Sequence, residues 1–79
     1  MTDSHALKEL INKKGLKLKY VAETLGLSSY GLSLKINNER EFKTSEILAL
    51  CDILDISDLN EREALFFNTK DDLKSTKGE

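Results

Sequence analysis

Apolar residues recur along most of the chain at intervals of three and four positions, with polar residues between them. This period is typical of amphipathic helices, whereas no stretch alternates apolar and polar residues in the manner of a β-strand. Proline, which interrupts helices, is absent from the sequence. The pattern therefore predicts an all-α fold, a compact bundle of five helices.

The first two predicted helices are short, and a glycine follows each of them. The first helix, capped by Asp3 or Ser4, runs to about Lys14, and the second spans roughly residues 18–25. Glycine after a helix favours the left-handed conformation that turns the chain away. The side chains expected to point inward are Leu7, Leu10, Ile11, Val21, Ala22 and Leu25.

Three further helices follow the same period. The third spans about residues 29–37 and the fourth about residues 44–54. Asn60 and Glu63 have the spacing of a capping box, which predicts a short fifth helix through Phe67. The side chains expected to be buried here are Leu32, Ile36, Phe42, Ile47, Leu48, Cys51, Leu54, Ile56 and Leu59.

The length of 79 residues fits one domain. Large apolar residues become rare after Phe67, where Leu73 is the only sizeable one. We therefore expect a domain over residues 1–67, followed by a polar, flexible tail over residues 68–79.

The charge is distributed unevenly along the chain. The net charge is −2, yet residues 1–43 carry +3 and residues 44–79 carry −5. Because DNA responds to the local potential of the face that docks on it, a negative total does not exclude DNA binding. The distribution favours an interaction of the first half with an anionic partner.

Several classes of function find no support in the sequence. No apolar run approaches the length of a membrane span, and the polar N-terminus lacks a signal core, so we expect a cytoplasmic protein. Cys51 stands alone on an apolar stripe and is interpreted as a buried, unreactive thiol. With no glycine-rich phosphate loop, nucleophile elbow or zinc-ligand set, we expect neither an enzyme nor a bound cofactor, metal or small-molecule substrate.

The segment from Leu16 to Asn38 has the pattern of two helices joined by a sharp turn. The small side chain of Ala22 allows the helices to approach closely, and Gly26 supplies a positive φ at the turn. Ser28 is a suitable cap for the third helix. This arrangement leaves the first turn of the third helix projecting outward, in a shape that fits the major groove of DNA.

At these positions the chain resembles the Cro/C1-type (XRE) helix-turn-helix domains of phage repressors and related bacterial regulators. The likeness covers about residues 6–59 and is carried by Leu7-Lys8-Glu9-Leu10-Ile11, Lys14-Gly15-Leu16, Val21-Ala22-Glu23-Thr24-Leu25-Gly26-Leu27-Ser28, Leu32-Ser33, Ile36-Asn37-Asn38, Arg40-Glu41-Phe42 and Glu46-Ile47-Leu48. It implies a lambda-repressor-like fold that binds double-stranded operator DNA as a homodimer, without a cofactor.

Carried over by position, the resemblance implies three sets of site residues. The residues that would contact bases are Ser29, Tyr30, Gly31, Ser33 and Leu34. Those that would contact phosphates are Lys17, Lys19, Lys35, Asn38, Arg40 and Lys43. The C-terminal helix often makes the dimer contact in this family, which here implies Leu65, Phe66 and Phe67, with packing inside the chain as the alternative.

The third helix departs from the family in its polar residues. No Arg, Gln or Asn lies between Ser28 and Ile36, and Leu18 stands where many members have Gln. Such side chains make the bidentate contacts that distinguish bases. A protein-interaction module on the same fold, such as an antirepressor, an antitoxin or a polymerase-binding protein, therefore remains the alternative function.

Overall fold

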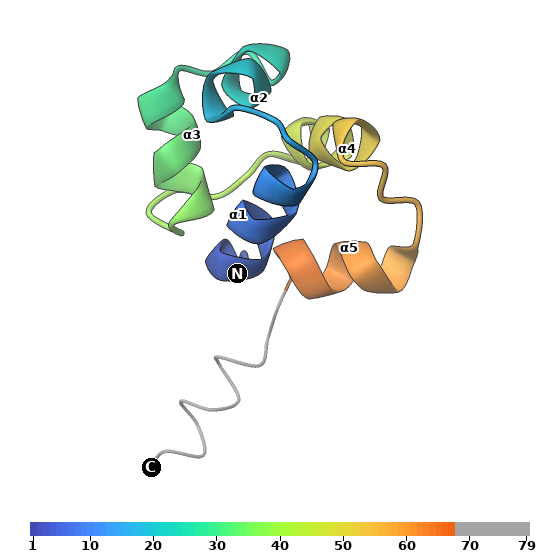
Figure 1. Cartoon of the computed structure of the whole chain (residues 1–79). Coiled ribbons are helices and arrows are strands. Elements are labelled where there is room, and N and C mark those ends of the chain that lie inside the picture. The colour runs from blue at the N-terminus through green and yellow to red at the C-terminus, as the bar shows by residue number, and fades with distance from the viewer. Residues whose placement is uncertain (68–79) are drawn as a thin grey trace.

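The computed structural model describes residues 1–67, and this part of the chain forms five α-helices (Figure 1). They are α1 (Ser4–Lys13), α2 (Leu18–Thr24), α3 (Ser29–Ile36), α4 (Thr44–Ile53) and α5 (Leu59–Phe66). The predicted all-α class is confirmed, and each of the first four helices ends within one residue of its predicted end. The predicted tail, residues 68–79, lies outside the described residues.

Side-chain caps begin three of the helices. The Asp3 carboxylate accepts from the backbone N–H of Ala6, and the Ser28 hydroxyl accepts from that of Gly31. α5 is capped by Asp58, whose carboxylate accepts from the N–H of Asn60. The predicted capping box at Asn60 is therefore wrong, because the cap lies two residues earlier, at Asp58, and Asn60 is the second residue of the helix.

The first four helices all end in the same way. The residue after each C-cap has a positive φ: Gly15, Gly26, Asn38 and Asp55. The following N–H returns to a carbonyl in the last helical turn, as from Leu27 to Ala22 at 2.8 Å. These hydrogen-bonded C-terminal turns fix the direction in which the chain leaves each helix, and so they determine how consecutive helices cross.

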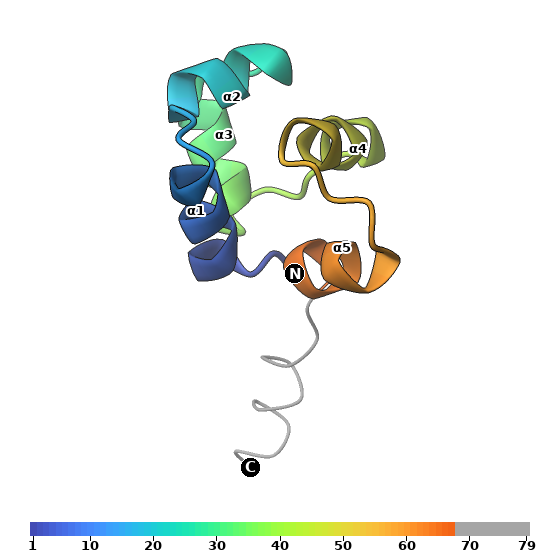
Figure 2. The same cartoon turned by 45° about the vertical axis from the view of Figure 1, so that its right-hand side comes forward.

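The helices form two groups around one core. α1, α2 and α3 lie on one side, and α4 and α5 lie on the other (Figures 1 and 2). The core residues are Leu7, Ile11, Val21, Ala22, Leu32, Ile36, Ile47, Leu50, Cys51, Leu54, Ile56, Leu65 and Phe66. Two predictions of burial are wrong: Leu48 is 52% exposed, because Leu50 takes the inward position of α4, and Leu59 is 62% exposed at the start of α5.

The segment before α1 is bonded to two helix ends. The Asn38 side chain forms a two-point contact with the Thr2 backbone, accepting from its N–H and donating to its carbonyl, both at 2.8 Å. The Ser4 hydroxyl donates to the Ile36 carbonyl, and the Asp3 N–H donates to the Leu65 carbonyl. Residues 2–4 therefore join the end of α3 to the end of α5.

A buried ion pair joins α3 to α4. The Lys35 ammonium lies 2.6 Å from the Glu46 carboxylate, and both side chains are more than nine-tenths buried. The same carboxylate oxygen accepts from the N–H of Lys43, which caps the first turn of α4. Because a buried charge needs both a counter-charge and hydrogen bonds, this pair fixes the relative position of the two helices.

The pair also changes the titration of Glu46. Burial alone would raise the pKa of this carboxyl group, but the hydrogen bonds from Lys35 and Lys43 and the charges of both lysines outweigh it. The pKa therefore lies below that of an ordinary glutamate. A carboxyl group with a lowered pKa stabilises the fold above its ordinary pKa and loses that effect as the pH falls through its folded-state pKa.

We predict that Leu32→Ala lowers the free energy of unfolding by about 2–5 kcal/mol, because the side chain is fully buried between helices and its loss leaves a cavity. The matched control, Leu59→Ala, should change it by about 0.5 kcal/mol or less, because that leucine is exposed. Urea unfolding followed by circular dichroism measures both. Equal losses in the two variants would contradict this account of the core.

We predict that Glu46→Gln lowers the free energy of unfolding by about 3 kcal/mol at neutral pH, because it leaves the Lys35 ammonium buried without a counter-charge. The difference from the parent protein should shrink as the pH falls from the ordinary glutamate pKa toward the lower pKa of Glu46. Urea titrations across the acid range test this, with the exposed Glu63→Gln as control. A difference that stays constant with pH would refute the role of the pair.

Candidate nucleic-acid interface

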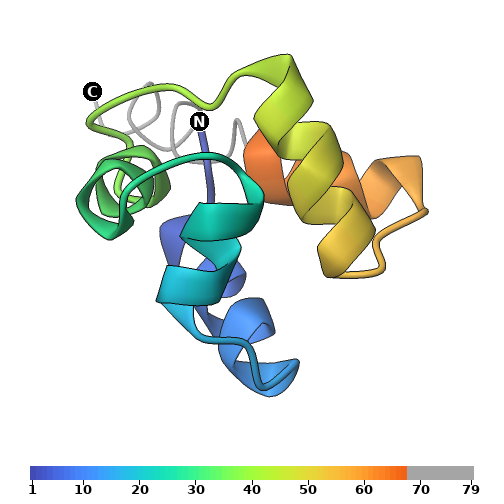
Figure 3. The same cartoon turned by 90° about the horizontal axis from the view of Figure 1, so that it is seen from above.

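α2 and α3 pack directly against each other across a tight turn. Ala22 is almost completely buried at their contact, and Gly26 has a φ of +73° in the turn. Leu32 and Ile36 hold the inner face of α3 against the core. Viewed from above, α3 and the connection between α4 and α5 lie at opposite edges of the molecule (Figure 3). Contacts with the core therefore hold α3 in place, and its outer side faces away from the core.

The first turn of α3 presents polar side chains to solvent. Ser29 is exposed, and Tyr30 is 74% exposed, more than any other large apolar or aromatic residue in the described part of the chain. Ser33 and Leu34 are half-buried further along the helix. The five predicted base-contacting residues, Ser29, Tyr30, Gly31, Ser33 and Leu34, thus all belong to α3, with the greatest exposure in its first turn.

Gly31 has a structural reason for its small size. A Cβ atom at this position would lie 3.2 Å from the Ser28 hydroxyl oxygen, which caps the helix by accepting from the Gly31 N–H. A larger residue would require this hydroxyl group to move by a few tenths of an ångström. Glycine therefore leaves the capping hydrogen bond undisturbed, and this effect was not apparent from the sequence pattern.

Four of the predicted phosphate-contacting side chains are exposed cations next to α3 in the chain. Lys17 and Lys19 lie at the start of α2, and Arg40 and Lys43 follow α3. The Arg40 backbone is held in place, because its N–H and that of Glu39 both donate to the Leu34 carbonyl. These cations come from the elements on both sides of α3.

Two other predicted phosphate contacts need correction. Lys35 is only 7% exposed, and its ammonium forms an ion pair with the Glu46 carboxylate. The prediction that it contacts phosphate is therefore wrong. The Asn38 side chain is occupied by its bonds to Thr2, although the residue itself remains exposed. The sequence pattern missed both roles, because each partner lies far from its residue in the chain.

Three carboxylates accompany the exposed cations. Glu23 lies on α2, and Glu39 and Glu41 flank Arg40 in the connection to α4, all of them exposed. With Lys35 neutralised, four cations face three anions around α3. The local positive potential is therefore weaker than the charge of the first half of the sequence suggested.

The predicted dimer residues separate into two kinds. Leu65 and Phe66 are buried in the core, and the Phe66 ring meets that of Phe42 edge-on at 5.8 Å between centroids. Their assignment to a dimer contact is therefore corrected to packing inside the chain, and the predicted inward folding of Phe42 is confirmed. Phe67 differs, because it is 49% exposed at the end of α5.

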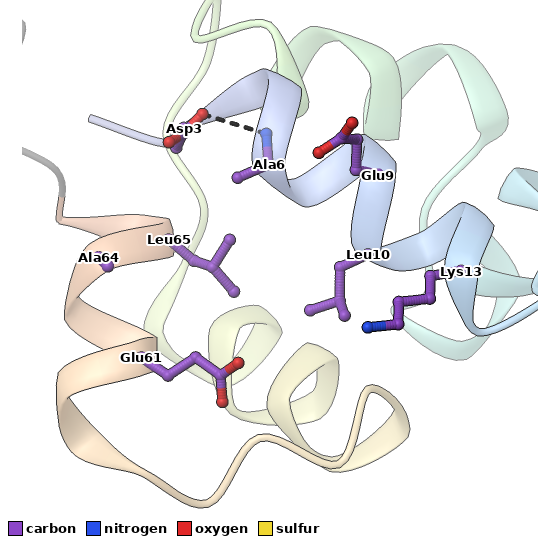
Figure 4. Close-up of a pocket in the computed structure, with 8 residues that line it drawn as sticks. All are labelled: Asp3, Ala6, Glu9, Leu10, Lys13, Glu61, Ala64 and Leu65. Atoms are coloured by element: carbon purple, nitrogen blue, oxygen red, sulfur yellow. Dashed lines mark hydrogen bonds between the residues drawn. The ribbon is translucent and has the colours of Figure 1, made fainter.

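A groove between α1 and α5 gathers charged side chains (Figure 4). Asp3, Glu9, Lys13 and Glu61 surround a floor that includes Leu10 and Leu65. The Asp3 carboxylate already caps α1. Within residues 1–67, no three His, Cys, Asp or Glu side chains come together as a metal site.

Two further features of the described helices bear on function. Cys51 is buried as expected, and its burial raises the pKa of the thiol, which disfavours the reactive thiolate. None of the helices between residues 1 and 67 has the length and apolar character needed to cross a membrane.

The comparisons with known proteins give one match. The model of a protein family of unknown function, DUF739, matches residues 3–69, which include all five helices. No curated protein and no solved structure matches the chain significantly.

Proposed function

The chain belongs to the DUF739 family, and we propose that it is a DNA-binding transcriptional regulator that uses α2 and α3 as a helix-turn-helix. In this proposal α3 enters the major groove of operator DNA, as in the Cro/C1-type domains that the sequence resembles. Two copies bind a two-fold symmetric site, with their α3 helices about 34 Å apart, which is one turn of DNA.

The observation that carries the proposal is the exposed polar first turn of α3, with exposed cations on the elements before and after it. Ser29 and Tyr30 are exposed to solvent, so their hydroxyl groups are accessible to base edges or phosphates. Lys19 and Arg40 are typical of these cations, and their ammonium and guanidinium groups match phosphate oxygens. The turn at Gly26 and the packing of Ala22 keep α3 at a fixed angle.

The composition of α3 bears on how the protein reads DNA. The helix offers hydroxyl groups and the half-buried Leu34, which can meet a thymine methyl group, and its only cation is paired with Glu46. Phosphate contacts therefore supply most of the affinity, and the hydroxyl groups supply moderate discrimination between sequences.

The charge around α3 favours a second candidate function. Glu39 and Glu41 beside Arg40 repel phosphate, and an exposed tyrosine such as Tyr30 is a common anchor in protein interfaces. A protein-interaction module that binds another regulator through α3 would use these same features. DNA binding that is unchanged in affinity and sequence preference by substitutions at Tyr30 and Arg40, or that is absent altogether, would favour this alternative.

We predict that DNA fragments selected from a random library bind with a strong dependence on salt. Arg40→Ala and Lys19→Ala should each reduce the slope of log binding constant against log salt by about one, because each removes one phosphate contact. Lys8→Ala is the matched control, since this exposed lysine lies on α1, outside α2 and α3, and should leave the slope unchanged. Fluorescence anisotropy at several salt concentrations measures the slopes.

We predict that Tyr30→Phe, which keeps the ring and removes the hydroxyl group, reduces the preference for selected over scrambled DNA several-fold, or by about 1 kcal/mol. Arg40→Ala should weaken binding to both DNAs equally, because phosphate contacts do not depend on sequence. Competition titrations separate the two effects. Failure to select any DNA at low salt would contradict the proposed function.

A further inference from the structure

We propose that a hollow between α1 and the start of α2 binds an acidic segment of a partner protein, with one large aliphatic side chain of that segment seated in the hollow. We call it the α1–α2 hollow, and its lining residues are Lys8, Ile11, Asn12, Leu16 and Leu18. The connection between α1 and α2 lies at one edge of the molecule, away from α4 and α5 (Figures 2 and 3). The inference goes beyond the proposed function, because it concerns a surface outside α3 and does not require DNA.

The inside of the α1–α2 hollow is mainly apolar. Leu16 and Leu18 form part of its wall, and Ile11 connects it to the core. Leu18 is 41% exposed, so an aliphatic side chain placed against it would remove apolar surface of both partners from water. The volume is about 260 Å³, whereas pockets for small-molecule ligands begin at about 300 Å³. The hollow therefore suits one inserted side chain better than a whole small molecule.

The segment of chain around the hollow is strongly positive. Residues 8–20 contain one carboxylate and five exposed lysines, which are Lys8, Lys13, Lys14, Lys17 and Lys19. The carboxylate, Glu9, lies 3.3 Å from the His5 imidazole and does not line the hollow. Within residues 1–67, none of these five lysines forms an ion pair. This segment is therefore more positive than the surroundings of α3, where three carboxylates accompany four cations.

Lys8 joins the apolar and the charged features. It lines the hollow, and it is exposed to solvent. A lysine can lay its apolar stem along a surface while its ammonium group stays in water. A carboxylate next to the inserted aliphatic side chain would therefore meet the Lys8 ammonium at the edge of the hollow. The ligand that fits carries an apolar group and negative charge in neighbouring positions.

A protein segment supplies this combination better than DNA or a membrane does. Phosphate groups of DNA would pair with the lysines, but they would leave Leu18 and the apolar hollow without a partner. A membrane surface takes up apolar side chains that project from a protein, whereas the leucines here line a hollow. A leucine or isoleucine flanked by aspartates or glutamates supplies both groups. The lysines attract such a segment and repel basic ones.

The groove between α1 and α5 does not define a partner in this way. Both signs of charge surround it, because Lys13 lines it together with Glu9 and Glu61 (Figure 4). Its leucines are already partly or wholly covered, so an inserted side chain would gain less there than beside Leu18.

A library of random peptides, displayed on phage and selected against the full chain without DNA, tests the proposal. We expect the enriched peptides to share a large aliphatic residue with Asp or Glu on both sides of it. For synthetic copies of these peptides, Leu18→Ser should raise the Kd about tenfold or more. The matched control is Leu59→Ser, which removes a more exposed leucine outside the hollow and should change the Kd by about twofold or less. Fluorescence anisotropy measures the Kd, and circular dichroism verifies that both variants remain folded.

Substitutions at Lys8 test the charge requirement. Lys8→Glu should raise the Kd several-fold, whereas Lys8→Arg, which keeps the positive charge, should leave it within about twofold. The Kd should also rise with salt concentration, because salt screens the attraction between exposed charges.

Several outcomes would overturn the proposal. They are a failure to enrich any peptide, enriched peptides without acidic residues, equal effects of Leu18→Ser and Leu59→Ser, and a Kd that Lys8→Glu leaves unchanged. Binding to phosphatidylserine vesicles that Leu18→Ser abolishes, with no peptide enriched, would assign the hollow to a membrane surface instead. Peptide binding by a chain that binds no DNA would refute the proposed function alone, and DNA binding without peptide binding would refute this inference alone.

Discussion

The buried contact between Lys35 and Glu46 is the constraint on which the arrangement of α3 and α4 depends. One carboxylate oxygen receives both the ammonium of α3 and a backbone N–H at the start of α4. Leu32 and Ile36 fix the inner face of α3 against the core, and the ion pair fixes its last turn. The contacts on the inner face of α3 thus determine which of its side chains face outward. The Lys35 ammonium stabilises the fold and is not available to a ligand.

Much of the fold could be predicted from local signals. The helical period, the cap at Ser28 and the turn residues Gly15 and Gly26 act over a few residues, so the sequence pattern locates α1 to α3 closely. Asn38 was also predicted to end a helix, because asparagine tolerates a positive φ.

The errors arose where local patterns allow more than one outcome. On α4, the phase of the helix permits either Leu48 or Leu50 inside, and the packing selects Leu50. The apolar character of Leu65 and Phe66 fits burial in the core and burial by a partner equally well, so the sequence pattern does not distinguish the two. A lysine such as Lys35 is normally exposed, and only a glutamate eleven residues away, across a loop, makes its burial possible. Of the candidate site, the elements and most exposed cations followed from the sequence, whereas the charge balance required the coordinates.

The short segment before α1 has a consequence for how the domain opens. Residues 2–4 bond the end of α3 and the end of α5, so α1, α3 and α5 are connected through one short segment. Separation of α5 from the rest breaks the bond at Asp3 and loosens the same segment that holds Asn38. We therefore expect the domain to unfold cooperatively as one unit, with amide hydrogen exchange in α3 and α5 governed by a common opening event rather than by independent fraying.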